Sequence, residues 1–135
     1  MAESIEISAV LPATARQVYE AWLDSAEHSA FTGDEATIEP RVGGAFNAGS
    51  GYIQGTTLEL EPDARIVQSW RTTDFPEGAE DSRLEVLLDE VPGGTRVTLL
   101  HTNIPDGQGE EYEQGWKEYY LEPMKRYFSE MAASG

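Results

Sequence analysis

The sequence predicts an α+β fold in which a curved antiparallel sheet of six or seven strands surrounds a long C-terminal helix. An alternating strand pattern opens the chain, and two short helical patterns follow it. Strand patterns separated by short turns fill the middle, and a long aromatic-rich helical pattern closes the chain. Short turns between successive strands imply hairpins, so the sheet should be antiparallel. The last helix is the only long amphipathic element available to cover its apolar face.

The first strand and the first helix have clear boundaries. Residues 5–11 alternate between apolar and polar side chains, which predicts a half-buried strand, and Pro12 ends it. Thr14 and Gln17 then stand in the spacing of a capping box, which marks the start of a helix. The apolar face predicted for this helix consists of Val18, Ala21 and Trp22.

A second short helix is predicted directly after the first. Asp24 and Glu27 resemble another capping box, and the helical pattern continues to about Phe31. His28 lies on this short helix, where we expect it to be a surface residue. The chain therefore begins with one strand followed by two helices.

Six strands are predicted between Ala36 and Asn103. Gly, Pro, Asn and Asp clusters that favour turns separate them, as in Val42-Gly43-Gly44 and Pro92-Gly93-Gly94. The predicted strands are residues 36–40, 44–48, 51–60, 65–73, 82–90 and 95–103.

The last helix is predicted from about Glu110 to Glu130, and its centre is the stretch QGWKEYYLEPMKRYF, residues 114–128. Aromatic side chains recur there at steps of three and four, in a stripe wide enough to leave some tyrosines at its margin. We expect Gly115 to let the helix approach the sheet closely. Pro123 lacks the amide that would bond the carbonyl of Tyr119, so a bend is expected there.

Composition excludes several classes of function. The 135 residues correspond to one domain, residues 1–135, and the absence of cysteine excludes disulfides and thiolate chemistry. A formal net charge of −16 repels phosphates and anionic lipids, so neither nucleic acid nor a membrane surface is an expected partner. No signal peptide or membrane span is visible, and a soluble cytoplasmic protein is expected. The acidity fits either adaptation to high salt or an ordinary acidic surface.

The sequence shows no constellation of catalytic or metal-binding residues, so neither a metal site nor a cofactor is expected. The two histidines do not stand in a metal-ligand spacing. His101 shares a strand face with Val97 and Leu99, so it should point inward, either as a satisfied core histidine or as a polar group that fixes a ligand. Trp70 is expected in the core, with Arg71 on the opposite, solvated face of the strand.

The chain resembles the C-terminal domain of activators of the ninety-kilodalton heat-shock chaperone ATPase, within the START-like, or SRPBCC, superfamily. The stretches that carry this resemblance are AFTGDEATIEPRVGGAF (30–46), IVQSWRTTDFPEG (66–78) and IPDGQGEEYEQGWKEYYLEPMKRYF (104–128). The resemblance implies a helix-grip fold, often with a cavity between sheet and helix, and a role in stress response. Eukaryotic activators carry a separate N-terminal domain that grips the chaperone, and 135 residues leave no room for it.

Three functions are open at this point. The first is binding of a small hydrophobic ligand between the sheet and the last helix, by a protein that is not an enzyme. The second is a protein-interaction domain that binds a chaperone or another protein. The third is a cyclase- or hydrolase-type enzyme, for which His101 is the only candidate base. A monomer or weak homodimer is expected. Predicted to line the ligand cavity are Trp22, Phe31, Phe46, Tyr52, Trp70, His101, Trp116, Tyr120 and Met124.

Overall fold

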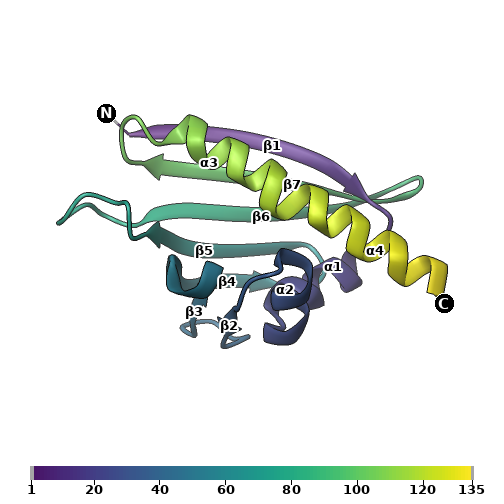
Figure 1. The fold of residues 1–135 in the computed structure, drawn as a ribbon. Helices are drawn as coiled ribbons and strands as arrows, with labels where there is room; N and C mark the ends of the chain where they lie inside the picture. The colour runs from purple at the N-terminus through teal and green to yellow at the C-terminus, as the bar shows by residue number, and fades with distance from the viewer. Residues whose placement is uncertain (1, 135) are drawn as a thin grey trace.

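A seven-stranded antiparallel sheet and one long helix form the body of the molecule, as predicted (Figure 1). The structure is a computed structural model that describes the backbone of residues 2–134 and the side chains of residues 2–131. The strand order in the sheet is β1-β7-β6-β5-β4-β3-β2. The strands are β1 (Glu3–Leu11), β2 (Thr37–Ile38), β3 (Ala45–Ala48), β4 (Ile53–Glu61), β5 (Arg65–Thr72), β6 (Ser82–Val91) and β7 (Gly94–Ile104).

Strands β2 to β7 follow one another as neighbours, so only the step from β1 to β2 crosses the sheet. Helices α1 (Ala15–Leu23) and α2 (Ser25–Thr32) make that crossing. Thr14 and Gln17 form the predicted capping box at the start of α1, with both reciprocal hydrogen bonds present. Asp24 caps α2 by accepting from the amide of Glu27, but the Glu27 carboxylate accepts from the hydroxyl of Tyr127 instead of closing a second box.

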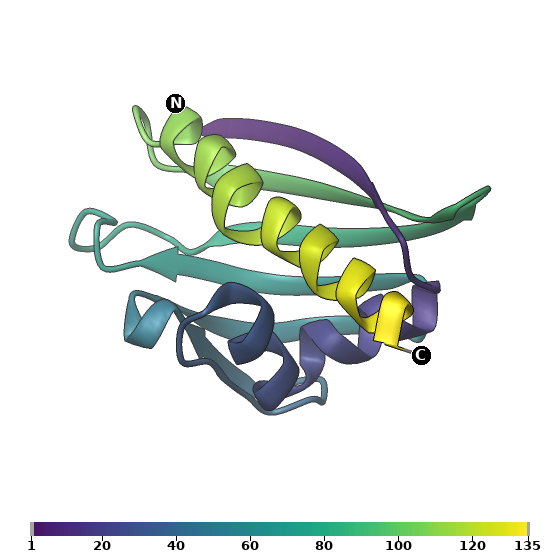
Figure 2. The ribbon, with the colours of Figure 1, turned by 45° about the vertical axis from the view of Figure 1, so that its right-hand side comes forward.

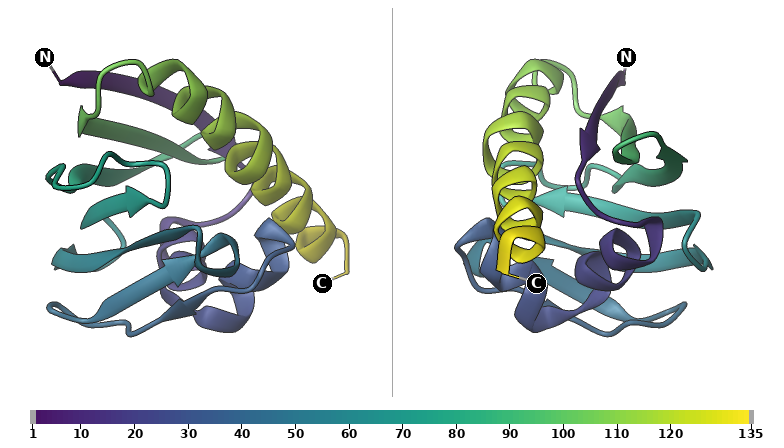
Figure 3. Two further views of the ribbon diagram at one scale, coloured as in Figure 1. Left: turned by 60° about the vertical axis from the view of Figure 1, so that its left-hand side comes forward. Right: turned by 90° about the vertical axis from the view of Figure 1, so that its right-hand side faces the viewer.

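The C-terminal helix lies diagonally across one face of the sheet (Figure 2). It consists of α3 (Gly109–Trp116), a π-helical turn (Lys117–Leu121) and α4 (Glu122–Ser134). Its C-terminal segment α4 packs against α2, and both α3 and α4 contact β1 (Figure 3). The carboxylate of Glu3 on β1 accepts from the amides of Gly107 and Gly109, which ties the start of this helix to the edge of the sheet.

Pro123 is accommodated by the π-helical turn that precedes it. In that turn the amide of Glu122 donates to the carbonyl of Lys117, five residues back, instead of four. A π turn is a common way for a helix to absorb a missing hydrogen-bond donor. The helix therefore continues past the proline as one element, and the bend expected at Pro123 stays a prediction.

The core fills the space between the inner face of the sheet and the three helical segments. Alternate residues of β6 and β7 point into it, among them Leu84, Val86, Val97 and Leu99. Trp70 is buried as predicted, and Arg71 on the outer face bonds the carboxylate of Asp81 at 2.7 Å. Because the sheet and the helix converge on this core, their aromatic residues meet near the N-terminal half of the helix.

Candidate functional site

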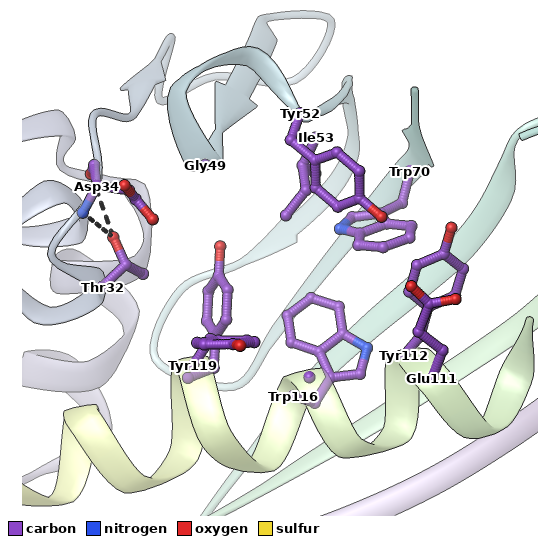
Figure 4. Close-up of a pocket in the computed structure, with 12 residues that line it drawn as sticks. Thr32, Asp34, Gly49, Tyr52, Ile53, Trp70, Glu111, Tyr112, Trp116 and Tyr119 are labelled. Atoms are coloured by element: carbon purple, nitrogen blue, oxygen red, sulfur yellow. Dashed lines mark hydrogen bonds between the residues drawn. The ribbon is translucent and has the colours of Figure 1, made fainter. Parts of the chain in front are cut away.

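A pocket of about 360 Å³ lies between the first half of the C-terminal helix and the sheet. Its floor is one face of the helix, its back is formed by β4 and β5, and the loop after α2 and the turn after β3 close one side (Figure 4). The helix contributes Glu111, Tyr112, Gly115, Trp116, Tyr119 and Tyr120. The other segments contribute Thr32, Asp34, Gly49, Tyr52, Ile53 and Trp70. We call this set of residues the aromatic pocket.

Aromatic rings in contact with one another make up most of the wall. Trp70 lies 5.5 Å from Trp116 and 4.9 Å from Tyr112, measured between ring centroids. The Trp116 and Tyr120 rings meet edge to face at 4.7 Å. Edge-to-face pairs fix the orientation of both rings, so this wall is preformed.

The hydroxyl groups of Tyr52 and Tyr112 in the pocket lining are held by hydrogen bonds. Tyr112 donates to the side-chain oxygen of Gln108 at 2.7 Å, so the hydroxyl of Thr72, 2.6 Å away, must donate to Tyr112. Tyr52 donates to the carboxylate of Asp74 at 2.6 Å. Burial raises the pKa of both tyrosines. They therefore remain neutral near pH 7 and present uncharged rings to the pocket.

His28 lies behind the pocket wall, where it anchors Tyr120. The prediction that it is a surface residue is wrong: it is 3% exposed. Its Nδ1 lies 2.8 Å from the carbonyl of Trp22, which can only accept, so Nδ1 carries the proton. Its Nε2 then accepts from the hydroxyl of Tyr120, also at 2.8 Å. Burial lowers the pKa of His28 to about 4, against a smaller opposing effect of the Trp22 carbonyl.

His101 is a buried structural residue next to the pocket. Its Nδ1 accepts from the indole N–H of Trp116 at 3.1 Å, so its Nε2 carries the proton and donates to the hydroxyl of Ser82 at 2.7 Å. Ser82 in turn donates to the carbonyl of Trp70. The ring is 0% exposed, and burial lowers its pKa to about 3. Both ring nitrogens are occupied, so His101 has no free lone pair with which to act as the base that the enzymatic alternative requires.

Two carboxylates and one exposed aromatic ring stand at the edge of the pocket. Asp34 and Glu111 are exposed and lie at opposite ends of the aromatic side chains in Figure 4. Tyr119 is 65% exposed, although its ring lines the pocket. Among the residues that the structure describes, no basic side chain forms an ion pair with either carboxylate.

Gly115 lies in the floor of the pocket. A Cβ atom added there would meet only the ring of Tyr119, at 3.9 Å, which is ordinary contact. The expectation that Gly115 permits close approach to the sheet is therefore wrong. Its missing side chain instead leaves part of the pocket empty.

Four of the nine residues predicted to line a ligand cavity line the aromatic pocket: Tyr52, Trp70, Trp116 and Tyr120. The other five, Trp22, Phe31, Phe46, His101 and Met124, are buried outside its lining. Tyr112, Gly115 and Tyr119 share the helical face of Trp116, so the helical period could have included them. No sequence signal pointed to Thr32, Asp34 or Gly49, which loops bring to the pocket.

Within the described part of the chain, no cluster of three or more His, Asp or Glu residues is arranged to hold a metal ion. The helices of that part are also too short or too polar to cross a membrane.

The curved sheet that wraps around a C-terminal helix, with a pocket between them, places the protein in the helix-grip class of START-like domains. Residues 12–129 match the family model described as "Activator of Hsp90 ATPase homolog 1-like protein". The chain belongs to this family.

Two curated relatives carry the name of the same activators. The chain is 32% identical over 111 residues to the "Activator of 90 kDa heat shock protein ATPase homolog" of Dictyostelium discoideum, which is 82% of this chain and 29% of that protein. It is 34% identical over 99 residues to the human "Activator of 90 kDa heat shock protein ATPase homolog 1", which is 73% of this chain and 29% of that protein. The match thus spans less than a third of each relative.

Solved structures share this fold over nearly the whole of this chain. The crystal structure described as an HSP90 activator from Plasmodium falciparum has a TM-score of 0.84 and 26% identity, covering 93% of this chain and 96% of that one. The crystal structure of CalU16 from Micromonospora echinospora has a TM-score of 0.79 and 29% identity, covering 98% of this chain and 80% of that one.

Proposed function

We propose that this protein is a chaperone-binding domain that regulates the ATPase of an Hsp90-class chaperone. The observation that carries the proposal is the similarity to the Plasmodium falciparum HSP90 activator, which extends over 96% of that chain. Almost the whole crystallised chain that bears this description is therefore matched by the domain described above.

The test is the steady-state ATPase rate of a purified Hsp90-class chaperone from the same organism, measured with increasing amounts of this protein. We expect a saturable change in the rate. An unrelated protein of similar size and negative charge serves as the control, because charge alone can perturb an enzyme assay. A rate that stays constant up to a large excess of this protein would refute the proposal.

We propose as a second function that the aromatic pocket binds a small molecule. Its volume, about 360 Å³, lies at the lower end of the range for ligand sites, and its wall is mostly apolar with a few polar groups. Its rings are held in place by contacts and hydrogen bonds from behind. A preformed apolar pocket loses little entropy when a ligand enters.

Substitutions of Gly115 test whether the pocket takes a ligand. Gly115→Ala should raise the free energy of unfolding by about 0.5–1 kcal/mol, because it removes a glycine from a helix without a clash. Gly115→Leu should fill the pocket. We expect 2-naphthol to raise the melting temperature of the parent and of Gly115→Ala in proportion to its concentration, but not that of Gly115→Leu.

The two Gly115 variants serve as a matched pair, because they change the same helical position and differ in side-chain volume. Urea unfolding of each establishes that it is folded before ligand is added. An equal thermal shift in the parent and in Gly115→Leu would place the binding site elsewhere. The absence of any shift in the parent at millimolar naphthol would contradict the proposal.

A further inference from the structure

The charges at the aromatic pocket are all negative. The lining contains two acidic residues, Asp34 and Glu111, and no lysine, arginine or histidine. The nearest basic residue along the helix, Lys117, is not in the lining, and its ammonium group lies 3.4 Å from the carboxylate of Glu113. Because the whole chain carries a net charge of −16, the long-range field has the same sign as the rim.

The aromatic rings that line the pocket also favour a positively charged ligand. An aromatic ring is negative over its face, so it attracts a cation within about 6 Å of its centroid. Six aromatic residues line this pocket, and Trp, the ring that binds cations best, occurs twice among them. Trp116 and Tyr119 project from the helix, and Trp70 projects from β5 toward them (Figure 4).

We propose that the aromatic pocket selects a small organic cation with an apolar body, such as a quaternary alkyl- or arylammonium compound. The inference rests on the second proposal above, that the pocket takes a small molecule, and it is independent of the chaperone proposal. The apolar body would lie against Trp70 and Trp116, and the cationic head would lie near Tyr119, between the carboxylates of Asp34 and Glu111 at the two ends of the pocket.

The alternatives are disfavoured by the same residues. A carboxylate or phosphate would meet two acids and no base, and it would lose its hydration without compensation. A neutral aromatic compound would gain only the burial of its apolar surface. A quaternary ammonium group spreads its charge over methyl groups that pack against rings. The pocket lining offers it six rings, the exposed one of Tyr119 among them, together with the carboxylates of Asp34 and Glu111.

A pair of ligands of equal shape tests the proposal. 3-(Trimethylammonio)phenol and 3-tert-butylphenol differ in charge but hardly in size, and both can be titrated into the protein by calorimetry. At low salt we expect the cation to bind about tenfold more tightly than the neutral phenol. Part of this preference should be lost at 0.5 M sodium chloride, because salt screens the exposed carboxylates.

Variants at the rim show whether the named residues cause the preference. Asp34→Asn combined with Glu111→Gln should lower the affinity for the cation about threefold to tenfold and leave the affinity for the neutral phenol unchanged. Glu35→Gln combined with Glu110→Gln removes two neighbouring charges outside the lining and should change neither ligand. Tyr119→Leu keeps apolar area but removes a ring, so it should also weaken the cation selectively.

Each remaining outcome counts against the proposal. If the neutral phenol binds as tightly as the cation, the charge preference is wrong, although the pocket still takes a small molecule. If the rim variants and their control variants lower the affinity for the cation equally, the preference comes from the overall charge of the protein and not from Asp34 and Glu111. If neither compound binds, this inference and the small-molecule proposal both fail.

Discussion

Replacing Trp116 by alanine is expected to lower the free energy of unfolding by about 3–5 kcal/mol, as measured by urea denaturation. The indole is 3% exposed and contacts Trp22, Trp70 and Tyr120. Its removal leaves a large cavity between helix and sheet. It also removes the indole N–H, which among the described residues is the one donor to Nδ1 of His101, and that buried nitrogen would then have no partner there.

Two further substitutions separate these contributions. Trp116→Phe keeps most of the ring volume but removes the N–H donor, so it should cost about 1–3 kcal/mol. Tyr119→Ala changes an aromatic residue that is 65% exposed on the same helix, and it should change stability by no more than about 0.5 kcal/mol. A cost below 1 kcal/mol for Trp116→Ala would mean that this ring does not hold the helix on the sheet.

Acid is expected to destabilise the protein through its two buried histidines. In the folded protein the pKa is about 4 for His28 and about 3 for His101, whereas both should be near 6.5 when the chain is unfolded. Between these limits the unfolded chain binds protons that the folded protein does not bind. The free energy of unfolding should therefore fall as the pH drops below about 6.5, with a slope that approaches about 1.4 kcal/mol per pH unit for each histidine.

The window from pH 6 to pH 5 is the one in which to measure this slope, because most carboxylates titrate below it. His28→Gln and His101→Gln should each remove about half of the slope, whatever they do to stability at neutral pH. The variants thus separate the proton effect from the loss of packing. A parent protein with constant stability from pH 6 to pH 5, or variants with the parent slope, would contradict the assignment of neutral buried imidazoles.

Local sequence patterns predicted the fold because its strands and caps depend on neighbouring residues. Alternation placed Val97, Leu99 and His101 on one face of β7, and all three are fully buried. The capping box forms as expected, because it depends only on Thr14 and Gln17, which stand three residues apart in the sequence.

The environment of His28 could not be predicted, because it depends on a partner 92 residues away. His28 lies on a helix of only eight residues, too short for periodicity to define a buried face. What buries it is the hydroxyl of Tyr120 from the last helix, together with rings of Trp22 and Phe31. The pattern of α2 alone carries no information about that contact.

The sequence could not predict which aromatic residues line the pocket and which fill the core. Trp22 and Trp116 are both aromatic residues on the inner faces of helices, and their rings stack at 6.2 Å, yet only Trp116 lines the pocket. The difference arises because Gly115 leaves space beside Trp116 and because the loops that carry Asp34 and Gly49 stop short of filling it. Loop positions of this kind follow from the whole fold.

Direct binding to an Hsp90-class chaperone is the central claim, and calorimetric titration of this protein into the purified chaperone tests it without relying on turnover. We predict saturable binding that weakens as the salt concentration rises from 0.05 to 0.5 M, because a surface with a net charge of −16 should meet a basic patch on its partner. An absence of binding at both salt concentrations, with protein shown to be folded, would contradict the claim.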